Sequence, residues 1–313
     1  MNNHSNEKFK TTIGGQALIE GILMRGPEKQ SIVVRGPEGI VVKTEELKLN
    51  AKRKSILQWP FIRGVAIFGA SMVNGVKALL YSAEFYPEET GEPSKFEMWL
   101  EKKLGSEKLE QAVIYFSAVL GILMSVGLFI LLPTILSGLI PGIIGNYFVR
   151  NLVEGLLKIF LFMGYLILVS QMKDMKRVFS YHGAEHKTIR CYEAKMPLTV
   201  DNVRIQTRKH PRCGTSFLLV VVCISILFGA VIRVDNTLLR MGLHLLMLLP
   251  IVAISYEFNR FVGRHDNWLT RALTAPGQWM QNFTTYEPDD DMIEVAIKAL
   301  EEVIPEEEGS DKW

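Results

Sequence analysis

The sequence predicts a mainly α-helical, polytopic membrane protein with about four transmembrane helices, a small N-terminal β-hairpin and further amphipathic or interfacial helices. Three observations support this fold class. The 313-residue chain is 48% hydrophobic and only 22% charged. Its apolar residues are concentrated in long runs rather than spread along the chain. Its polar start, "MNNHSNEKFKTTIGGQ", lacks the apolar core of a secretory signal, so we expect no cleaved export peptide.

Net charge and cysteine content argue against two other classes. The net charge of +2 gives no indication of nucleic-acid binding. The three cysteines are irregularly spaced, which is not the pattern of a disulfide framework. The lipid bilayer is therefore the partner that the sequence indicates, and it does not identify a protein partner or a substrate.

We expect residues 1–110 to form a cytoplasmic N-terminal region. Two β-branched runs within 31–44 flank the turn sequence GPEG, which predicts a β-hairpin. The stretch before it is glycine-punctuated and contains Glu20, for which we favour a surface position or an ion pair with Arg25 over a functional role.

Residues 59–85 form an apolar segment whose uncharged centre we expect to be too short to span a membrane. Ser71 and Gly75 give this segment a small-residue face for close helix packing. We therefore expect a helix at the interface or docked on the spans. A polar linker is expected to follow at 86–110.

Four long apolar runs predict the transmembrane helices, two in each of the regions 111–172 and 214–262. The runs cover residues 114–141, 151–172, 214–232 and 237–258. A helix needs about 20 apolar residues to cross a bilayer core, and the first run can tilt or kink at Pro133. Four runs of this length make a soluble helical bundle the weaker interpretation.

Glu154, Lys158 and His244 are ionisable residues inside these runs. Glu154 and Lys158 stand one helical turn apart near one end of the second run, where we expect them to pair and snorkel. His244 lies among leucines, which favours a hydrogen-bonded packing histidine over an intramembrane relay. Because we expect no charged pairs inside the spans, transport ranks last among the functions considered.

The orientation follows from basic residues. The loop at 173–213 carries ten Lys or Arg, whereas the connections on the opposite side offer Arg150, Arg233 and Arg240. The positive-inside tendency therefore predicts that this loop and both termini are cytoplasmic. A nucleic-acid patch would also be basic, but membrane orientation already explains these charges.

We expect residues 263–313 to form a cytoplasmic C-terminal amphipathic region. Trp268 and Trp279 are suited to an interfacial position. An amphipathic helix is predicted within 286–304, beginning at Pro288. Its apolar residues share one face for packing, and they are Ile293, Ala296, Ile297 and Leu300. The last residues, "PEEEGSDKW", are expected to form a solvated tail.

The loop at 173–213 contains the pattern H-x-x-E-H, formed by His182, Glu185 and His186. On a helix, positions four residues apart share a face, so both histidines can bind one ion from the same side. Glu185 is then close enough to act as a general base on a water at that ion. The pattern reverses the H-E-x-x-H signature of zinc proteases, and zinc can bring the pKa of a bound water to about 7.

A second pair of soft ligands, His210 and Cys213, follows in the same loop. The four residues predict a site for zinc or another divalent transition metal. Four protein ligands would close a structural site, whereas three ligands and a water would leave a catalytic one. Without a metal, the residues would form a basic, hydrogen-bonding membrane collar.

Four further residues are weaker candidates. Arg190 or Lys187 could stabilise a developing oxyanion. Glu257 could supply a ligand from a separate helix, although an ion pair with Arg260 or Arg264 is the simpler interpretation. Cys191 is either a ligand or a buried small residue.

Five stretches together resemble one protein family: "GGQALIEGILMRGP", "YHGAEHKTIRCYE", "RKHPRCGTSF", "ISYEFNR" and "TTYEPDDDMIEVAI". They resemble the YqhQ family of bacterial membrane proteins, a family of unknown function, over about residues 12–304. The resemblance implies a multi-pass protein of the bacterial cytoplasmic membrane. Members are labelled predicted metal-dependent enzymes, and the resemblance implies no substrate. It points to the same five residues, His182, Glu185, His186, His210 and Cys213.

These observations predict an integral membrane protein with a metal site on the cytoplasmic side. The first hypothesis is a metal-dependent hydrolase, with a peptide as the best-supported substrate class and an ester or phosphoester as alternatives. The second is a non-enzymatic scaffold or membrane-biogenesis factor with a structural zinc.

Overall fold

The computed structural model describes residues 9–47, 59–86, 116–117, 119–140, 146–265, 267–307 and 309–312. The expected linker lies outside these residues apart from its first position, as does the start of the first apolar run. The chain forms two compact units. The sheet unit comprises Met1–Tyr86, Leu166–Ile224 and Leu249–Trp313, and the helix unit comprises Pro87–Tyr165 and Ser225–Leu248. The regions expected from the sequence divide the chain by its membrane topology, whereas these two units are defined by contacts within the fold. The topological regions therefore stay a prediction.

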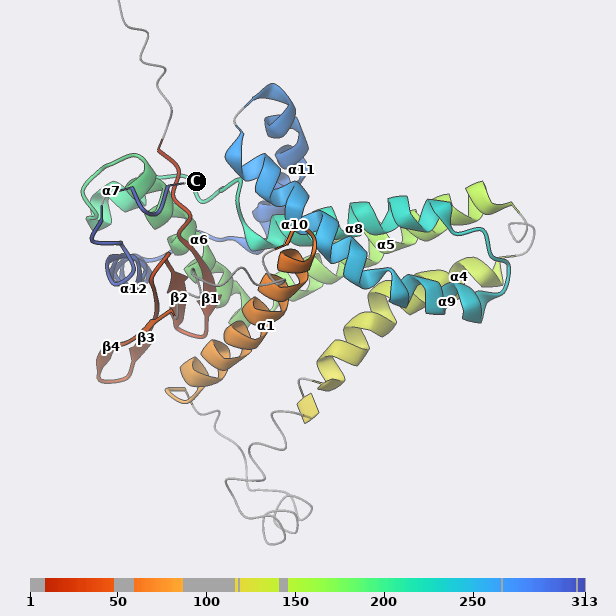
Figure 1. Ribbon diagram of the computed structural model, residues 1–313. Coiled ribbons are helices and arrows are strands. Elements are labelled where there is room, and N and C mark those ends of the chain that lie inside the picture. The colour runs from red at the N-terminus through yellow and green to blue at the C-terminus, as the bar shows by residue number, and fades with distance from the viewer. Residues whose placement is uncertain are drawn as a thin grey trace, which may run out of the picture. The chain divides into compact units, whose positions relative to one another are not determined.

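The N-terminal strands form a four-stranded antiparallel meander in the order β1-β2-β3-β4 (Figure 1). The strands are β1 Gly14–Leu18, β2 Gly21–Arg25, β3 Lys29–Gly36 and β4 Gly39–Glu46. The predicted hairpin is confirmed as β3–β4, with Gly36 paired to Gly39. Gly39 has a φ of 132°, which side chains rarely adopt, so glycine is required in this turn.

Strands β2 and β3 bury both faces of the sheet because their apolar residues alternate between them, whereas β4 is largely exposed. One face, with Ile22, Met24 and Val33, packs on α6 (Lys173–Glu193) and α12 (Asp290–Glu301). The opposite face, with Leu18, Leu23, Ile32 and Val34, packs on Ala78 of α1 (Ile62–Ala83). Segments from the beginning, middle and end of the chain therefore share one core.

This shared core restricts how the chain can cross a membrane. The sheet, α6 and α12 pack together, so they lie on the same side of any bilayer. The number of crossings between the sheet and α6 must therefore be even, and so must the number between α6 and α12. The prediction that both termini lie on one side agrees with this packing, whereas the packing does not identify which side.

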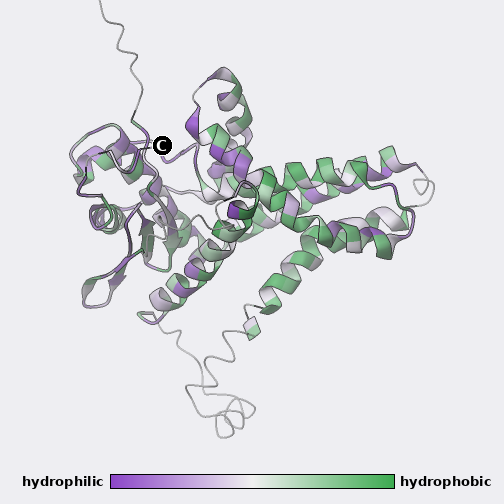
Figure 2. Ribbon diagram, viewed as in Figure 1, coloured by the Kyte–Doolittle hydropathy of each residue, from purple (hydrophilic) through white to green (hydrophobic). Residues whose placement is uncertain are grey.

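By length and composition alone, four of the described helices could cross a membrane. They are α1, the helix Val119–Leu139, α5 (Tyr147–Gln171) and α8 (Gly214–Val231). The broken pair α9 (Thr237–Leu246) and α10 (Leu248–Arg264) adds another candidate and covers the fourth predicted run. Figure 2 shows how apolar these helices are. The helix Val119–Leu139 contains a π-helical turn, η2 Gly127–Leu131, before α4 (Leu132–Leu139) with its Pro133, the residue at which a kink was predicted.

The prediction that the segment at 59–85 is too short to span was wrong in its length argument. It forms the 22-residue helix α1, which is long and apolar enough to cross. Its predicted small-residue face is confirmed in part: Gly75 is buried where a side chain would collide with Gln16, whereas Ser71 is exposed. If Val119–Leu139 and α5 both cross before α6, the number of crossings is even when α1 stays docked on the sheet.

Two predictions near the chain ends were wrong. Glu20 pairs with Arg177 and accepts from the Tyr181 hydroxyl at 3.2 Å, rather than pairing with Arg25. The final segment is not fully solvated, because Asp311 is only 1% exposed. Its carboxylate accepts from the Thr11 hydroxyl at 2.5 Å, since β-type pairing brings the two ends of the chain together.

The remaining helices include α7 (Val200–Arg204) and α11 (Trp268–Thr284). The predicted C-terminal amphipathic helix is confirmed as α12, which buries Ile293, Ala296 and Leu300. Trp268 and Trp279 on α11 are exposed, and their interfacial position stays a prediction.

The prediction that Glu154 and Lys158 snorkel was also wrong. They are 2% and 5% exposed, and they form a buried cluster with Arg240 and His244 inside the helix unit. The expectation of spans without charged pairs therefore fails. It fails because Arg240 and His244 of α9 lie against the Glu154 carboxylate of α5.

Candidate metal centre

Helix α6 presents the two histidines of the H-x-x-E-H pattern from its buried middle. Tyr181, Ala184 and Ile189 of this helix pack into the core against the sheet and α12, which fixes how the helix is rotated. His182 and His186 are one turn apart and share another face, with ring centroids separated by 4.4 Å. The local sequence therefore determines the first half of the site.

Cys213 lies directly before α8 and brings a third ligand to the same point. Its Sγ is 3.1 Å from His182 Nε2. One ligand atom from each of His182, His186 and Cys213 lies within 4.8 Å of the others, and the site that they form is buried. Around a zinc ion with bonds of about 2.0–2.3 Å, ligand atoms are roughly 3.3–3.6 Å apart. We call these three residues the His–Cys triad.

Backbone carbonyls orient both imidazoles of the triad. His182 Nδ1 lies 2.8 Å from the carbonyl oxygen of Thr284, and His186 Nδ1 lies 2.6 Å from that of Arg208. A carbonyl only accepts, so Nδ1 carries the hydrogen in each ring. The Nε2 atoms are left to bind an ion, which is how metal-binding histidines are commonly held. His186 Nε2 is buried without a hydrogen-bond partner, as expected of an atom that requires a cation.

The charges of the triad support each other. Burial alone would lower the pKa of His182, but the Cys213 thiolate raises that pKa to about 9. In turn, burial would raise the pKa of Cys213, yet His182 and His186 hold it well below its usual range. The lowered pKa of Cys213 favours its thiolate, which is the form that coordinates a cation.

Glu185 lies beside the triad with one carboxylate oxygen anchored. Its Oε1 accepts from the Gly15 amide of β1 at 3.0 Å, while its Oε2 is buried without a hydrogen-bond partner. Burial raises the pKa of Glu185, and the neighbouring histidines oppose that rise. At Gly15, a Cβ would lie 2.7 Å from the Leu23 carbonyl and 3.0 Å from the Glu185 carboxyl carbon. Glycine therefore allows the strand to approach the carboxylate.

His210, predicted as a ligand, is not one of the three triad residues, although its ring centroid lies 5.5 Å from that of His186. Its backbone N–H donates to Gln281 Oε1 at 2.8 Å, and its carbonyl accepts from Gln281 Nε2 at 2.7 Å. Its ring Nε2 is 3.5 Å from Glu193 Oε2. Burial lowers the pKa of His210 to about 4, although Glu193 opposes that effect. The ring is therefore neutral and directed at a carboxylate.

The three auxiliary candidates are engaged elsewhere. Lys187 donates to the Arg204 carbonyl at 2.9 Å and pairs with Glu287 at 2.7 Å. Arg190 donates to the Lys209 carbonyl at 2.6 Å. Glu257 forms a two-point ion pair with Arg63 of α1, rather than with Arg260 or Arg264.

Cys191 also lies away from the triad. It is completely buried in a small core with Val203 and Ile293. The structure thus supports its interpretation as a buried small residue.

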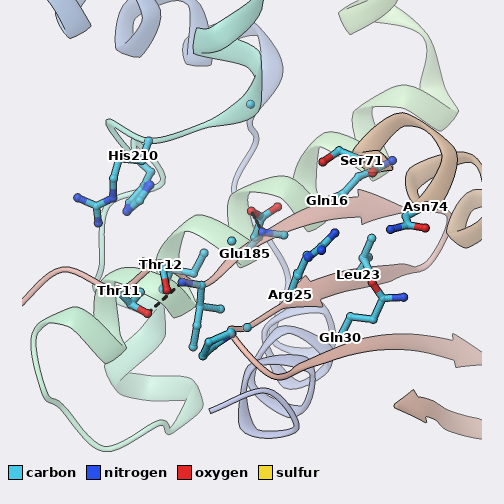
Figure 3. A pocket seen from close by; sticks show the side chains of 18 residues that line it. Thr11, Thr12, Gln16, Leu23, Arg25, Gln30, Ser71, Asn74, Glu185 and His210 are labelled. Atoms are coloured by element: carbon cyan, nitrogen blue, oxygen red, sulfur yellow. Dashed lines mark hydrogen bonds between the residues drawn. The ribbon is translucent and has the colours of Figure 1, made fainter. Parts of the chain in front are cut away.

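A cavity of about 450 Å³ adjoins Glu185. In Figure 3, Glu185 lies above β1, with His210 on one side and Ser71 and Asn74 of α1 on the other. Polar groups from several elements line this space, including Thr12, Gln16, Arg25, Gln30 and Arg212. A polar molecule in the cavity would therefore reach the general-base candidate.

Together, the fold and the site define a class: a membrane protein with apolar helices and a His–Cys triad formed by a sheet-packed helix and the residue that precedes α8. The chain belongs to the DUF1385 family, described as a protein family of unknown function, whose model matches residues 59–306. It is similar to "Uncharacterized protein YqhQ" of Bacillus subtilis (strain 168), with 35% identity over 306 residues, covering 96% of this chain and 94% of that protein. No solved structure matches the chain.

Sequence reasoning missed the residues that hold Glu185 and His210 beside the triad. Gly15, Glu193 and Gln281 come from three distant segments and act through long-range contacts. Only Gly15 had a local signal, since it belongs to a glycine pair that precedes an apolar run.

Proposed function

We propose that this protein is a membrane-bound, metal-dependent hydrolase. Zinc, or another divalent transition metal, is held by His182, His186 and Cys213, and Glu185 is the general base. The substrate is a peptide, ester or phosphoester presented at the membrane surface, with a peptide favoured by the motif.

The number of ligands carries this proposal. A structural zinc site usually has four protein ligands, and a catalytic site has three. The triad supplies three, while the fourth candidate, His210, is directed at Glu193. The donor set of two nitrogens and one sulfur suits zinc. The unpartnered Glu185 Oε2 beside it is the group that an open site needs.

In this proposal the metal would act as a Lewis acid and lower the pKa of water to about 7. Glu185 removes the proton from the attacking water, with its Oε1 held in place by Gly15. The cavity beside Glu185 orients the substrate. Lys187 and Arg190 are engaged with backbone carbonyls of the 194–212 segment, so we propose no oxyanion role for them.

A structural zinc in a non-enzymatic scaffold is the second candidate. The burial of all three triad residues favours it, because closed sites exclude solvent. In that case Glu185 would only hold β1 in position through Gly15, and its ability to accept a proton would have no role.

We also propose that the site faces the cytoplasm of a bacterium and that the membrane is the cytoplasmic one. The ten basic residues at 173–213 support this orientation. Since α6 shares a core with the sheet and α12, both termini would follow it. A reducing compartment also suits Cys213, which must remain a thiolate. A membrane-impermeant thiol reagent that labels a cysteine placed at residue 198 in intact cells would contradict this orientation.

The functional test compares the full chain with Glu185→Gln in lipid nanodiscs. Three probe pools are offered: lipid-anchored fluorogenic peptides, a fluorogenic ester and a fluorogenic phosphodiester. We expect zinc-dependent hydrolysis of one pool, about 10²–10⁴-fold slower in the variant. Zinc content should remain equal, because every ligand is retained. Equal turnover by both proteins would support the scaffold instead.

A further inference from the structure

A second buried polar site lies in the helix unit, inside helices apolar enough to cross a membrane. Its centre is the Glu154 carboxylate of α5, which is 2% exposed. Glu154 Oε1 lies 2.6 Å from His244 Nε2 and 3.2 Å from Lys158 Nζ. Glu154 Oε2 accepts from Arg240 Nε at 2.9 Å. We call these four residues the Glu154 cluster.

The cluster lies deep within its helix. Glu154 and Lys158 follow Tyr147, the first residue of α5, by two and three turns, which is roughly 10 and 16 Å along the axis. A bilayer core is about 30 Å thick, so a helix that starts at its boundary carries Lys158 to about the middle. Ionisable groups at such depth are costly and are retained where they have a function.

Polar neighbours hold the cluster from three elements. Thr134 of α4 donates to Glu154 Oε1 at 2.9 Å, and Asn151 of α5 accepts from Arg240. The Arg240 Nη1 atom donates to the Ile232 carbonyl at 3.1 Å. Arg150, one turn before Glu154, is fully buried and donates to the Asp235 carbonyl at 3.0 Å. The cluster is therefore a preorganised site and not a chance encounter of side chains.

Its charges do not balance when every basic group is protonated. Arg240 is permanently charged and neutralises Glu154. Protonated Lys158 and His244 would add two positive charges beside a single shared oxygen, with Arg150 nearby as a third. An unpaired buried charge costs several kcal/mol, so both groups cannot keep their protons. At most one of the two groups therefore carries an additional proton at a time.

We propose that the Glu154 cluster is an intramembrane proton-binding site in which Lys158 and His244 compete for one exchangeable proton. When Lys158 holds the proton, His244 is neutral and its Nε2–H donates to Glu154. When Lys158 is neutral, the proton occupies His244 Nδ1 and the ring becomes an imidazolium. A proton needs no cavity, which fits side chains that are at most 5% exposed. Such a site is what a proton-coupled membrane process requires, and it does not depend on the metal centre.

The test follows the charge of His244 with ring-¹⁵N-labelled histidine in nanodiscs, between pH 5 and 9. His244→Asn assigns the signal, and exposed His265 is the internal control. Lys158→Met removes the competitor, so His244 should gain its second proton at a pH about one unit or more higher than in the wild type. Lys158→Arg fixes a permanent charge beside the ring, so His244 should remain neutral throughout.

The competition would be established if the pH at which His244 gains its second proton rises in Lys158→Met and falls in Lys158→Arg, while the His265 signal is unchanged. The same His244 titration in wild type and Lys158→Arg would overturn the proposal. If Lys158→Met does not fold, Lys158→Arg alone decides, because it keeps the length and charge of the side chain.

Discussion

The two buried polar sites of this protein are built in opposite ways. In the sheet unit, two imidazoles and a thiol lie close together, and His186 Nε2 is buried without a hydrogen-bond partner. In the helix unit, cationic groups gather around one carboxylate and exceed it in charge. The first arrangement offers several ligand atoms to one cation, whereas the second offers more basic groups than its single carboxylate can neutralise. The same polar residue types thus favour a metal ion in one place and proton exchange in the other.

The largest expected effect separates true ligands from their neighbours. His182→Ala or His186→Ala should reduce bound zinc from about one per chain to nearly none, because two remaining ligands bind weakly. His210→Ala should retain the zinc, since its ring is directed at Glu193. Elemental analysis of detergent-purified protein measures this, with His244→Ala as the control from the other site. If His210→Ala loses zinc while His244→Ala retains it, His210 is a ligand.

The second effect concerns the Glu154 cluster. Glu154→Ala leaves Arg240, Lys158 and His244 without their shared counter-charge, and breaking a buried pair in this way costs about 3–5 kcal/mol. Denaturant unfolding in detergent should show this loss. Zinc content should not change, because the triad belongs to the sheet unit. An unchanged unfolding midpoint would show that the cluster is hydrated and not buried.

A smaller effect is expected at the glycine pair of β1. Gly15→Ala places a methyl group against the Leu23 carbonyl and Glu185, so hydrolysis should slow several-fold while zinc is retained. Gly14→Ala is the matched control, because nothing lies within 4 Å of its added Cβ. Equal turnover of the two variants would argue against anchoring of Glu185 by β1.

The smallest effect should come from a surface pair with the same helical spacing as Glu154 and Lys158. Lys298 and Glu302 are also four residues apart, but their side chains are 45% and 28% exposed. Water and salt screen such pairs, so Glu302→Gln should leave the unfolding midpoint unchanged within error. A shift as large as that of Glu154→Ala would mean that spacing, rather than burial, sets the strength of these pairs.

Local patterns predicted the parts of the molecule that depend on neighbouring residues. The apolar runs, the turn at Gly39 and the helical spacing of His182 and His186 are all local, and the structure contains them. Strands β1 and β2 were missed because each has only five residues, among glycines. Their formation depends on packing against α6 and α12, which sequence periodicity does not encode.

The polar sites were predicted less completely, because their geometry depends on distant segments. His210 and Cys213 are close in sequence, yet only Cys213 belongs to the triad. Gln281 of α11 holds the backbone of His210, whose ring is directed at Glu193. The Glu154 cluster combines α5 with α9, and its sequence signal was overlooked. Arg150, Glu154 and Lys158 recur every four residues on one helix, and Arg240 and His244 do the same on the other.

X-ray absorption at the zinc edge of the purified full-length protein, together with zinc stoichiometry, tests the central claim most directly. The account predicts about one zinc per chain, bound by two nitrogens, one sulfur and one further light atom from solvent. That shell should lose its sulfur in Cys213→Ser. Absence of zinc from protein purified without chelator, or a shell filled by four protein ligands, would contradict an open metal site on the His–Cys triad.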